Sequence, residues 1–182
     1  TLQGTNTFTG PVNLNGGNLD FSTVTNIGGG ASNLGAGSVI NLGGGTLRFI
    51  GGTNQTTDRP INASVNSTLN TSGTSGAEIS YTGPVNMGAF QLTLTGASAA
   101  NVGNLSGGIT QTGTAADILV NSGTWNLTGT NTFSDDVIVT GTSAILNLNS
   151  TGTLAYTAGT SSGLYSRDGA VININAANVS GV

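Results

Sequence analysis

Histidine, lysine and cysteine are all absent from the 182-residue chain, and each absence removes a class of chemistry. Without histidine there can be no Ser-His-Asp triad, and the commonest general base and metal ligand is missing. Without cysteine there are no disulfides, thiolate nucleophiles or cysteine-based zinc sites. Without lysine there is no Schiff-base former and no phosphate anchor of the P-loop kind. The sequence therefore predicts that the chain is not an enzyme and carries no catalytic, cofactor or metal site.

Charge is also scarce, because only 5% of the residues are charged and the net charge is −4. Average soluble domains carry roughly 25% charged residues. Three isolated arginines cannot neutralise a row of phosphates or attract an anionic membrane. The apolar runs are too short to span a bilayer, and no secretory leader opens the sequence. We expect no nucleic-acid binding and no membrane insertion, and we expect any export signal to lie elsewhere.

Glycine and alternating apolar residues dominate what remains. The 31 glycines are too many for a helical protein, since each costs about 1 kcal/mol in a helix interior. Val12 and Leu14 alternate with Asn13 and Asn15, which is the period of a strand with one buried face. Hydrophobic residues make up 36% of the chain, so a disordered polar chain is not expected. The pattern predicts short strands joined by glycine turns, with almost no helix.

The alternation belongs to an internal repeat. Residues 12–21 (VNLNGGNLDF) match residues 40–49 (INLGGGTLRF) at an offset of 28. Residues 81–94 match 8–21, so Val85, Met87, Leu92 and Leu94 are expected in the same four apolar places. Residues 127–139 match 2–14, which assigns Val137 and Val139 to the first two of those places. Repeats of this length are typical of solenoids.

We therefore predict that residues 1–182 form one right-handed parallel β-helix, a β-solenoid. A unit of about 22–28 residues gives roughly seven coils stacked at about 4.8 Å, a rod of about 35 Å. Aliphatic side chains should form columns inside, while threonine and asparagine form ladders outside. An antiparallel sandwich is the alternative, but a sandwich does not require the same four apolar places in successive units.

One segment carries a family resemblance. The string GTNTFTGPVNLNGGNL (residues 4–19) resembles the autotransporter-associated β-strand repeat, also called the passenger-associated transport repeat, of bacterial surface proteins. The copy at 129–139 departs from it, because Asp135 and Asp136 replace Gly10 and Pro11. The resemblance implies a passenger-type β-helix that is exported across the outer membrane and displayed at the cell surface. In that family the repeat is associated with secretion and folding of the stalk and carries no activity itself.

A few charged residues are the remaining candidates for chemistry. Asp135 and Asp136 are adjacent acids, for which the sequence favours a solvated turn over a weak calcium site or a catalytic carboxylate pair. No calcium-loop pattern surrounds them. The neighbours Asp58-Arg59 and Arg167-Asp168 are predicted to be surface ion pairs.

Aromatic residues are expected mainly inside the solenoid. Phe8, Tyr81 and Phe133 share one repeat position, which predicts an internal stack rather than a sugar-binding platform. Trp125 alternates with Leu127 and is expected in the core or partly exposed, with a glycan contact as the weaker alternative. Neither feature predicts a ligand.

The function predicted from these features is a structural or adhesive stalk segment of a secreted bacterial surface protein. Its partners would be further repeats of the same chain, or second copies stacking end to end. Three alternatives stay open: a surface-glycan-binding module, an ice-binding solenoid and a degraded polysaccharide-acting enzyme. Short Thr-X-Thr runs bear on the ice-binding alternative, namely Thr5/Thr7, Thr93/Thr95 and Thr128/Thr130.

Overall fold

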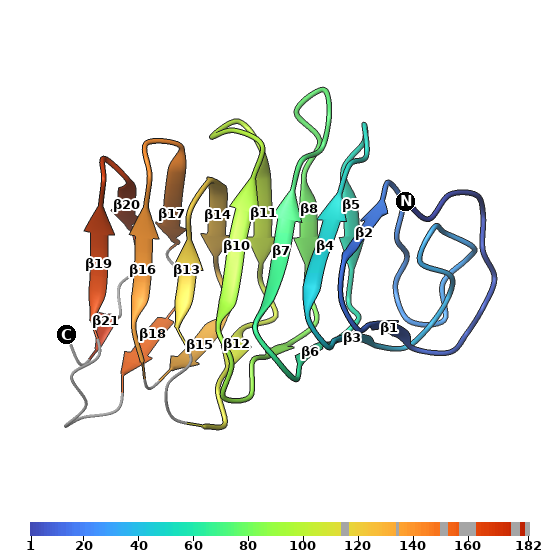
Figure 1. Cartoon of the computed structure of the whole chain (residues 1–182), viewed down its shortest axis with the longest axis horizontal. Helices are drawn as coiled ribbons and strands as arrows, with labels where there is room; N and C mark the ends of the chain where they lie inside the picture. The colour runs from blue at the N-terminus through green and yellow to red at the C-terminus, as the bar shows by residue number, and fades with distance from the viewer. Residues whose placement is uncertain (114–116, 134, 150–152, 157–162, 176–178, 181–182) are drawn as a thin grey trace.

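Three parallel β-sheets wind into a solenoid of about six turns in the computed structural model of the chain (Figure 1). The structure describes residues 1–113, 117–133, 135–149, 153–156, 163–175 and 179–180. Every pairing between the named strands is parallel, and no helix occurs in the described residues. The predicted parallel β-helix is therefore confirmed. Among the described residues no helix has the length and apolar character needed to cross a lipid bilayer.

Each sheet collects one strand from successive coils. The eight-stranded sheet contains β1 (Val12–Leu14), β3 (Ile40–Leu42), β6 (Ile61–Ala63), β9 (Val85–Asn86), β12 (Ile109–Thr110), β15 (Thr130–Phe133), β18 (Thr153–Tyr156) and β21 (Val179–Ser180). The seven-stranded sheet contains β2 (Asn18–Phe21), β4 (Gly45–Phe49), β7 (Ser67–Thr71), β10 (Leu92–Gly96), β13 (Ile118–Val120), β16 (Val137–Thr140) and β19 (Leu164–Arg167). The six-stranded sheet contains β5 (Gln55–Thr57), β8 (Ile79–Tyr81), β11 (Val102–Leu105), β14 (Gly123–Leu127), β17 (Ala144–Leu148) and β20 (Val171–Ile174).

The core consists of aliphatic columns that run along the solenoid axis. In the eight-stranded sheet the register places Ile40, Ile61 and Val85 over one another, each at most 1% exposed. A second column in the seven-stranded sheet contains Leu47, Leu69, Leu94, Val120 and Val139. Burying one such side chain contributes about 1.5–3 kcal/mol, so the repeated apolar places account for much of the stability.

Coil length varies, and this corrects part of the predicted repeat. Register partners lie 28 residues apart from Val12 to Ile40, but only 19 apart from Ile118 to Val137. Val85 does share the column of Val12, as predicted. The assignment of Val137 and Val139 to that column was wrong, because both lie on β16 in the seven-stranded sheet. A fixed offset cannot identify the sheet when the turns between strands differ in length.

A similar slip affects the second half of the third copy. Leu94 lies in the column of Leu19, through Leu47 and Leu69, instead of the predicted column of Phe21. Leu92 is correspondingly placed beside Ser67, two residues earlier on the strand. The alternation of buried and outward residues survives this slip, since a shift of two keeps every side chain on the same face.

Outward-facing amides form the predicted polar ladders. Asn41 donates to Asn13 at 2.8 Å, and Asn86 donates to Asn62 at 2.8 Å, on the eight-stranded sheet. On the six-stranded sheet the donations link neighbouring coils at 2.6–2.7 Å, from Asn126 to Asn104, from Asn147 to Asn126 and from Asn173 to Asn147. Each amide thus satisfies the one in the preceding coil, as in stacked amide ladders generally.

The first coil is closed by a segment without strands. Residues 22–36 occupy the place where later coils carry a strand of the six-stranded sheet, and they form the loops beside β1 and β2 in Figure 1. The side chain of Asn33 organises this segment, because its Oδ1 accepts from the backbone N–H groups of Ser22 and Thr23 at 2.7 and 3.0 Å. Its Nδ2 donates to the carbonyl of Gly4 at 2.8 Å. The segment is therefore held by individual polar contacts rather than by a ladder.

Candidate functional site

The outward face of the seven-stranded sheet changes character along the axis. Residues that point outward from this sheet recur at every second position, so the strand order sets them in columns. One column reads Thr46, Thr68, Thr93, Leu119, Ile138 and Tyr165 from the first coils to the last. Three hydroxyl-bearing residues are thus followed by two aliphatic residues and an aromatic one.

Carboxylates lie directly beside the aliphatic part of this column. Asp117 and Asp136 each precede their strands and stand two residues before Leu119 and Ile138, on the same face. The corresponding position in the preceding coil is Gln91. We call the five partly buried residues Asp117, Leu119, Asp135, Asp136 and Ile138 the acidic–aliphatic patch.

The three carboxylates of the patch are crowded. One oxygen from each of Asp117, Asp135 and Asp136 can be chosen so that all lie within 4.8 Å of one another. Partial burial, followed by the charges of Asp135 and Asp136, raises the pKa of Asp117, although hydrogen bonds from the backbone of Asp136 and the side chain of Gln91 partly oppose this. The Oδ1 atoms are partly used locally, because Asp135 accepts from the backbone N–H of Asp136 at 3.0 Å and Asp136 accepts from that of Gly163 at 2.9 Å. The arrangement concentrates negative charge that a cation of any kind would relieve.

The turn predicted at Asp135 and Asp136 is present, since both lie in the connection before β16, but both residues are partly buried rather than fully solvated. The sequence did not identify Asp117 as the third member. Asp117 lies one coil earlier than Asp136, 19 residues before it in the sequence, and no pair of strands in the described residues is stacked at a shorter interval. Three carboxylates supply part of the oxygen shell of a hard cation such as Ca²⁺, which takes six to eight oxygens.

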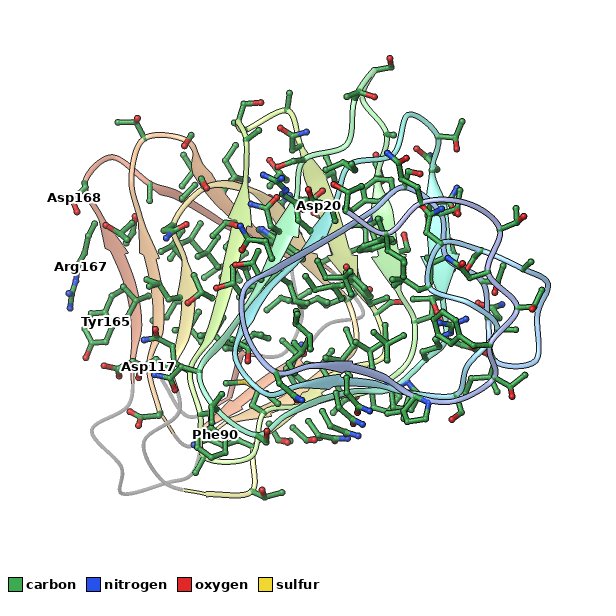
Figure 2. All side chains as sticks on the ribbon, turned by 45° about the vertical axis from the view of Figure 1, so that its right-hand side comes forward. Asp20, Phe90, Asp117, Tyr165, Arg167 and Asp168 are labelled. Atoms are coloured by element: carbon green, nitrogen blue, oxygen red, sulfur yellow. The ribbon has the colours of Figure 1, made fainter. Side chains whose placement is uncertain are left out.

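Beyond the patch, the last strand of the sheet carries an aromatic–cation pair. The guanidinium carbon of Arg167 lies over the Tyr165 ring, 5.3 Å from its centroid. Figure 2 shows both residues on the same side of the molecule as Asp117. Asp168 accepts a hydrogen bond from the Thr140 hydroxyl at 2.6 Å, so the predicted ion pair between Arg167 and Asp168 is replaced by contacts to other neighbours.

Arg59 contradicts the prediction of a surface ion pair with Asp58. Its side chain is completely buried, and its guanidinium donates to the carbonyls of Leu34 at 2.7 Å and Gly35 at 2.6 Å. Burial lowers the pKa of Arg59, which the neighbouring charge of Asp58 partly offsets. Arg59 thus secures the strandless segment of the first coil.

The ion pair that does form joins Asp20 to Arg48. Two charge-assisted hydrogen bonds of 2.8 and 2.7 Å connect the carboxylate to Nε and Nη2 of the guanidinium. It is the one salt bridge found in the described residues. The sequence contained a signal for it, because Asp20 and Arg48 hold the same place in the first two repeat copies and therefore stack on adjacent strands.

Aromatic residues fulfil their predictions only in part. Trp125 is fully buried, as predicted, with its ring above Gly103, where a Cβ atom would approach the ring to 2.4 Å. Tyr81 is also buried, and burial raises the pKa of its hydroxyl. The predicted stack of Phe8, Tyr81 and Phe133 was wrong, because Phe8 is 42% exposed outside the regular strands, and Tyr81 on β8 and Phe133 on β15 belong to different sheets. The side chain of Phe133 lies outside the described part.

Comparison with known proteins gives no relative from which to transfer a function. No protein-family model, curated protein or solved structure matches the chain. The resemblance to the autotransporter-associated repeat therefore stays a prediction.

Proposed function

We propose that this chain is a structural stalk segment of a secreted bacterial surface protein, which continues along its axis through contacts at its two ends. One observation carries the proposal. Ile174, an inward side chain on the last strand of the six-stranded sheet, is 52% exposed, and Phe8 and Ile27 are exposed at the first coil. Tyr165 and Val171 are exposed for another reason, because both point outward from the lateral faces.

The end at β20 gives the clearest physical reason. Ile174 continues the inward column of Leu127 and Leu148, yet 52% of its surface is exposed, whereas Leu148 is 1% exposed. An edge strand also presents unpaired backbone groups, and solenoids bury such ends against caps or neighbouring repeats. Further coils of a longer chain, or a second copy stacked end to end, would bury both the side chain and the edge.

The lateral faces of the solenoid favour a structural stalk over ice binding or glycan binding. The column of Thr46, Thr68 and Thr93 ends at Leu119, so the regular two-dimensional threonine array that favours ice binding is interrupted. The exposed ring of Tyr165 carries Arg167 over one face, which leaves less of it for stacking on a sugar. Surface location and bacterial origin rest on the resemblance of residues 4–19 to the secretion-associated repeat.

Sedimentation velocity of the 182-residue chain over a concentration series tests the proposal. We expect concentration-dependent association into species with a rising frictional ratio, as end-to-end contact lengthens the particle. Ile174→Asp should suppress this association at least about tenfold, because burying an unpaired carboxylate is costly. Val65→Asp is the matched control, since Val65 is 41% exposed but lies in a turn midway along the solenoid. A wild-type chain that remains monomeric at all concentrations would contradict end-to-end association.

A further inference from the structure

The acidic–aliphatic patch is not required by the fold. Threonine fills the same column at Thr46, Thr68 and Thr93, and its branched carbon suits a strand while its hydroxyl remains solvated. Leu119 and Ile138 instead place aliphatic groups on the outward face of adjacent strands, about 4.8 Å apart. Neighbouring outward aliphatic residues with a polar rim are typical of the surfaces through which proteins bind partners.

The charge beside these aliphatic groups indicates the chemistry of the partner. Three of the seven acids in the sequence converge in the patch. The one ion pair of the described residues is elsewhere, between Asp20 and Arg48, and Arg167 in the next coil lies over Tyr165. None of the described arginines forms an ion pair with the carboxylates of the patch. A basic partner would therefore complement the negative charge of the patch.

We propose that the acidic–aliphatic patch docks an extended basic segment of a partner protein, in which lysine or arginine alternates with aliphatic residues. The carboxylate column and the aliphatic column stand about 7 Å apart, the distance spanned by two residues of a strand. An extended segment lying across the strands sends alternate side chains to its two edges. Cationic groups would then reach Asp117 and Asp136 while aliphatic groups contact Leu119 and Ile138.

A peptide fits this surface better than a glycan does. Sugar recognition commonly uses an open aromatic face, but the patch itself contains no aromatic residue. The adjacent Tyr165 has Arg167 over its ring and packs close to Gly163, where an added Cβ would come within 2.8 Å of the ring. The proposal is independent of the stalk function, because it concerns a lateral face and not the ends.

The test is fluorescence anisotropy with a labelled peptide of three Lys-Leu repeats added to the full 182-residue chain. We expect saturable binding that weakens as salt concentration rises. Peptides of three Ser-Leu or three Lys-Ser repeats should bind at least about tenfold more weakly, because each lacks one of the two contacts. Equal binding of the Lys-Ser peptide would indicate unspecific charge attraction and would overturn the proposal.

Variants of the chain locate the binding to the patch. Leu119→Thr with Ile138→Thr installs the residue found earlier in the same column, so the fold should persist, as far-UV circular dichroism would check. We expect this pair, or Asp117→Asn with Asp136→Asn, to weaken Lys-Leu binding about tenfold or more. Thr46→Ser with Thr68→Ser on the polar half is the matched control and should leave binding unchanged.

A gain-of-function variant keeps the proposal falsifiable if the first variants unfold. Thr93→Leu extends the aliphatic column by one coil toward β10 and keeps the Gln91 side chain that hydrogen-bonds to Asp117, and we expect it to strengthen Lys-Leu binding several-fold. Absence of any strengthening in this folded variant would contradict the proposal. Binding of neutral oligosaccharides, lost in Leu119→Thr with Ile138→Thr while the Lys-Leu peptide fails to bind, would assign the face to glycans instead.

Discussion

The first coil and the later coils of this solenoid are held together by different means. From β5 onward each coil adds a strand to all three sheets, and its side chains repeat those of the coil before. The first coil supplies strands to only two sheets, and residues 22–36 are fixed by the side chains of Asn33 and Arg59. Regular coils therefore depend mainly on the fit between successive like residues, whereas the strandless part of the first coil depends mainly on a few polar side chains.

The largest loss of stability is expected for a substitution at Gly103, where a glycine interrupts the stacking of like residues in the regular coils. Gly103 stands between Ile79 and Trp125 in an inward column, and the Trp125 ring fills the space that a side chain would need. Gly103→Val should destabilise the chain by about 3 kcal/mol or more, because the ring and the new side chain cannot both be accommodated. Urea unfolding followed by far-UV circular dichroism measures the loss.

A second substitution shows whether the ring is the cause. Trp125→Leu alone leaves a void and should cost about 3 kcal/mol. Combined with Gly103→Val, it gives a column of ordinary aliphatic residues from Ile79 to Leu146. The double variant should then be clearly more stable than the sum of the two single effects predicts, since residues in contact are not additive. Simple additivity would mean that Gly103 is required for a reason other than the ring.

A smaller and more local effect is expected in the first coil. Arg59→Met keeps much of the aliphatic volume but leaves the carbonyls of Leu34 and Gly35 without the guanidinium. We expect a loss of about 2 kcal/mol, because two charge-assisted hydrogen bonds disappear while the cost of burying the arginine is relieved.

Hydrogen exchange can show whether that loss is confined to the first coil. Amides of residues 22–36 should exchange faster in Arg59→Met, while those of β10 and β14 stay protected. Arg48→Met is the control, because its side chain is 41% exposed and should matter less. Faster exchange along the whole solenoid would mean that the first coil and the later coils unfold as one unit.

The same contrast explains how much of the fold could be predicted. Val12 and Ile40 could be aligned because the two copies are similar over ten residues and lie in successive coils, so that equivalent residues stack directly. Val137 could not be placed, because the short coil between Ile118 and Val137 rotates the matching sequence into another sheet. Alternation alone fixes which residues are buried, but the strand to which they belong depends on turn lengths that small insertions change.

The candidate site was less predictable than the fold. Asp117 becomes a neighbour of Asp135 and Asp136 only through the register of β13 with β16, which the repeat did not reveal. Arg59 was predicted at the surface because it directly follows Asp58. Its actual partners are the carbonyls of Leu34 and Gly35, which residue types alone do not reveal. The partner of Asp20 could have been found, since Arg48 occupies the same place one coil later.

The smallest loss of stability is expected for the ion pair of Asp20 and Arg48, which links the first coil to the second through equivalent positions of adjacent strands. Hydrogen bonding to Arg48 holds the pKa of Asp20 below its ordinary value, although partial burial opposes this. A carboxyl whose pKa is lowered in the folded state contributes stability above its unfolded pKa and loses it as the pH falls through the folded value. Asp20→Asn should therefore cost up to about 1 kcal/mol at pH 7, a modest amount because Arg48 is partly exposed. Urea unfolding midpoints of wild type and Asp20→Asn should approach each other as the pH falls below about 3.9, where an unfolded aspartate titrates, and meet once the folded carboxyl is protonated. A difference that persists unchanged in acid would assign the effect to packing of the first coil rather than to the ion pair.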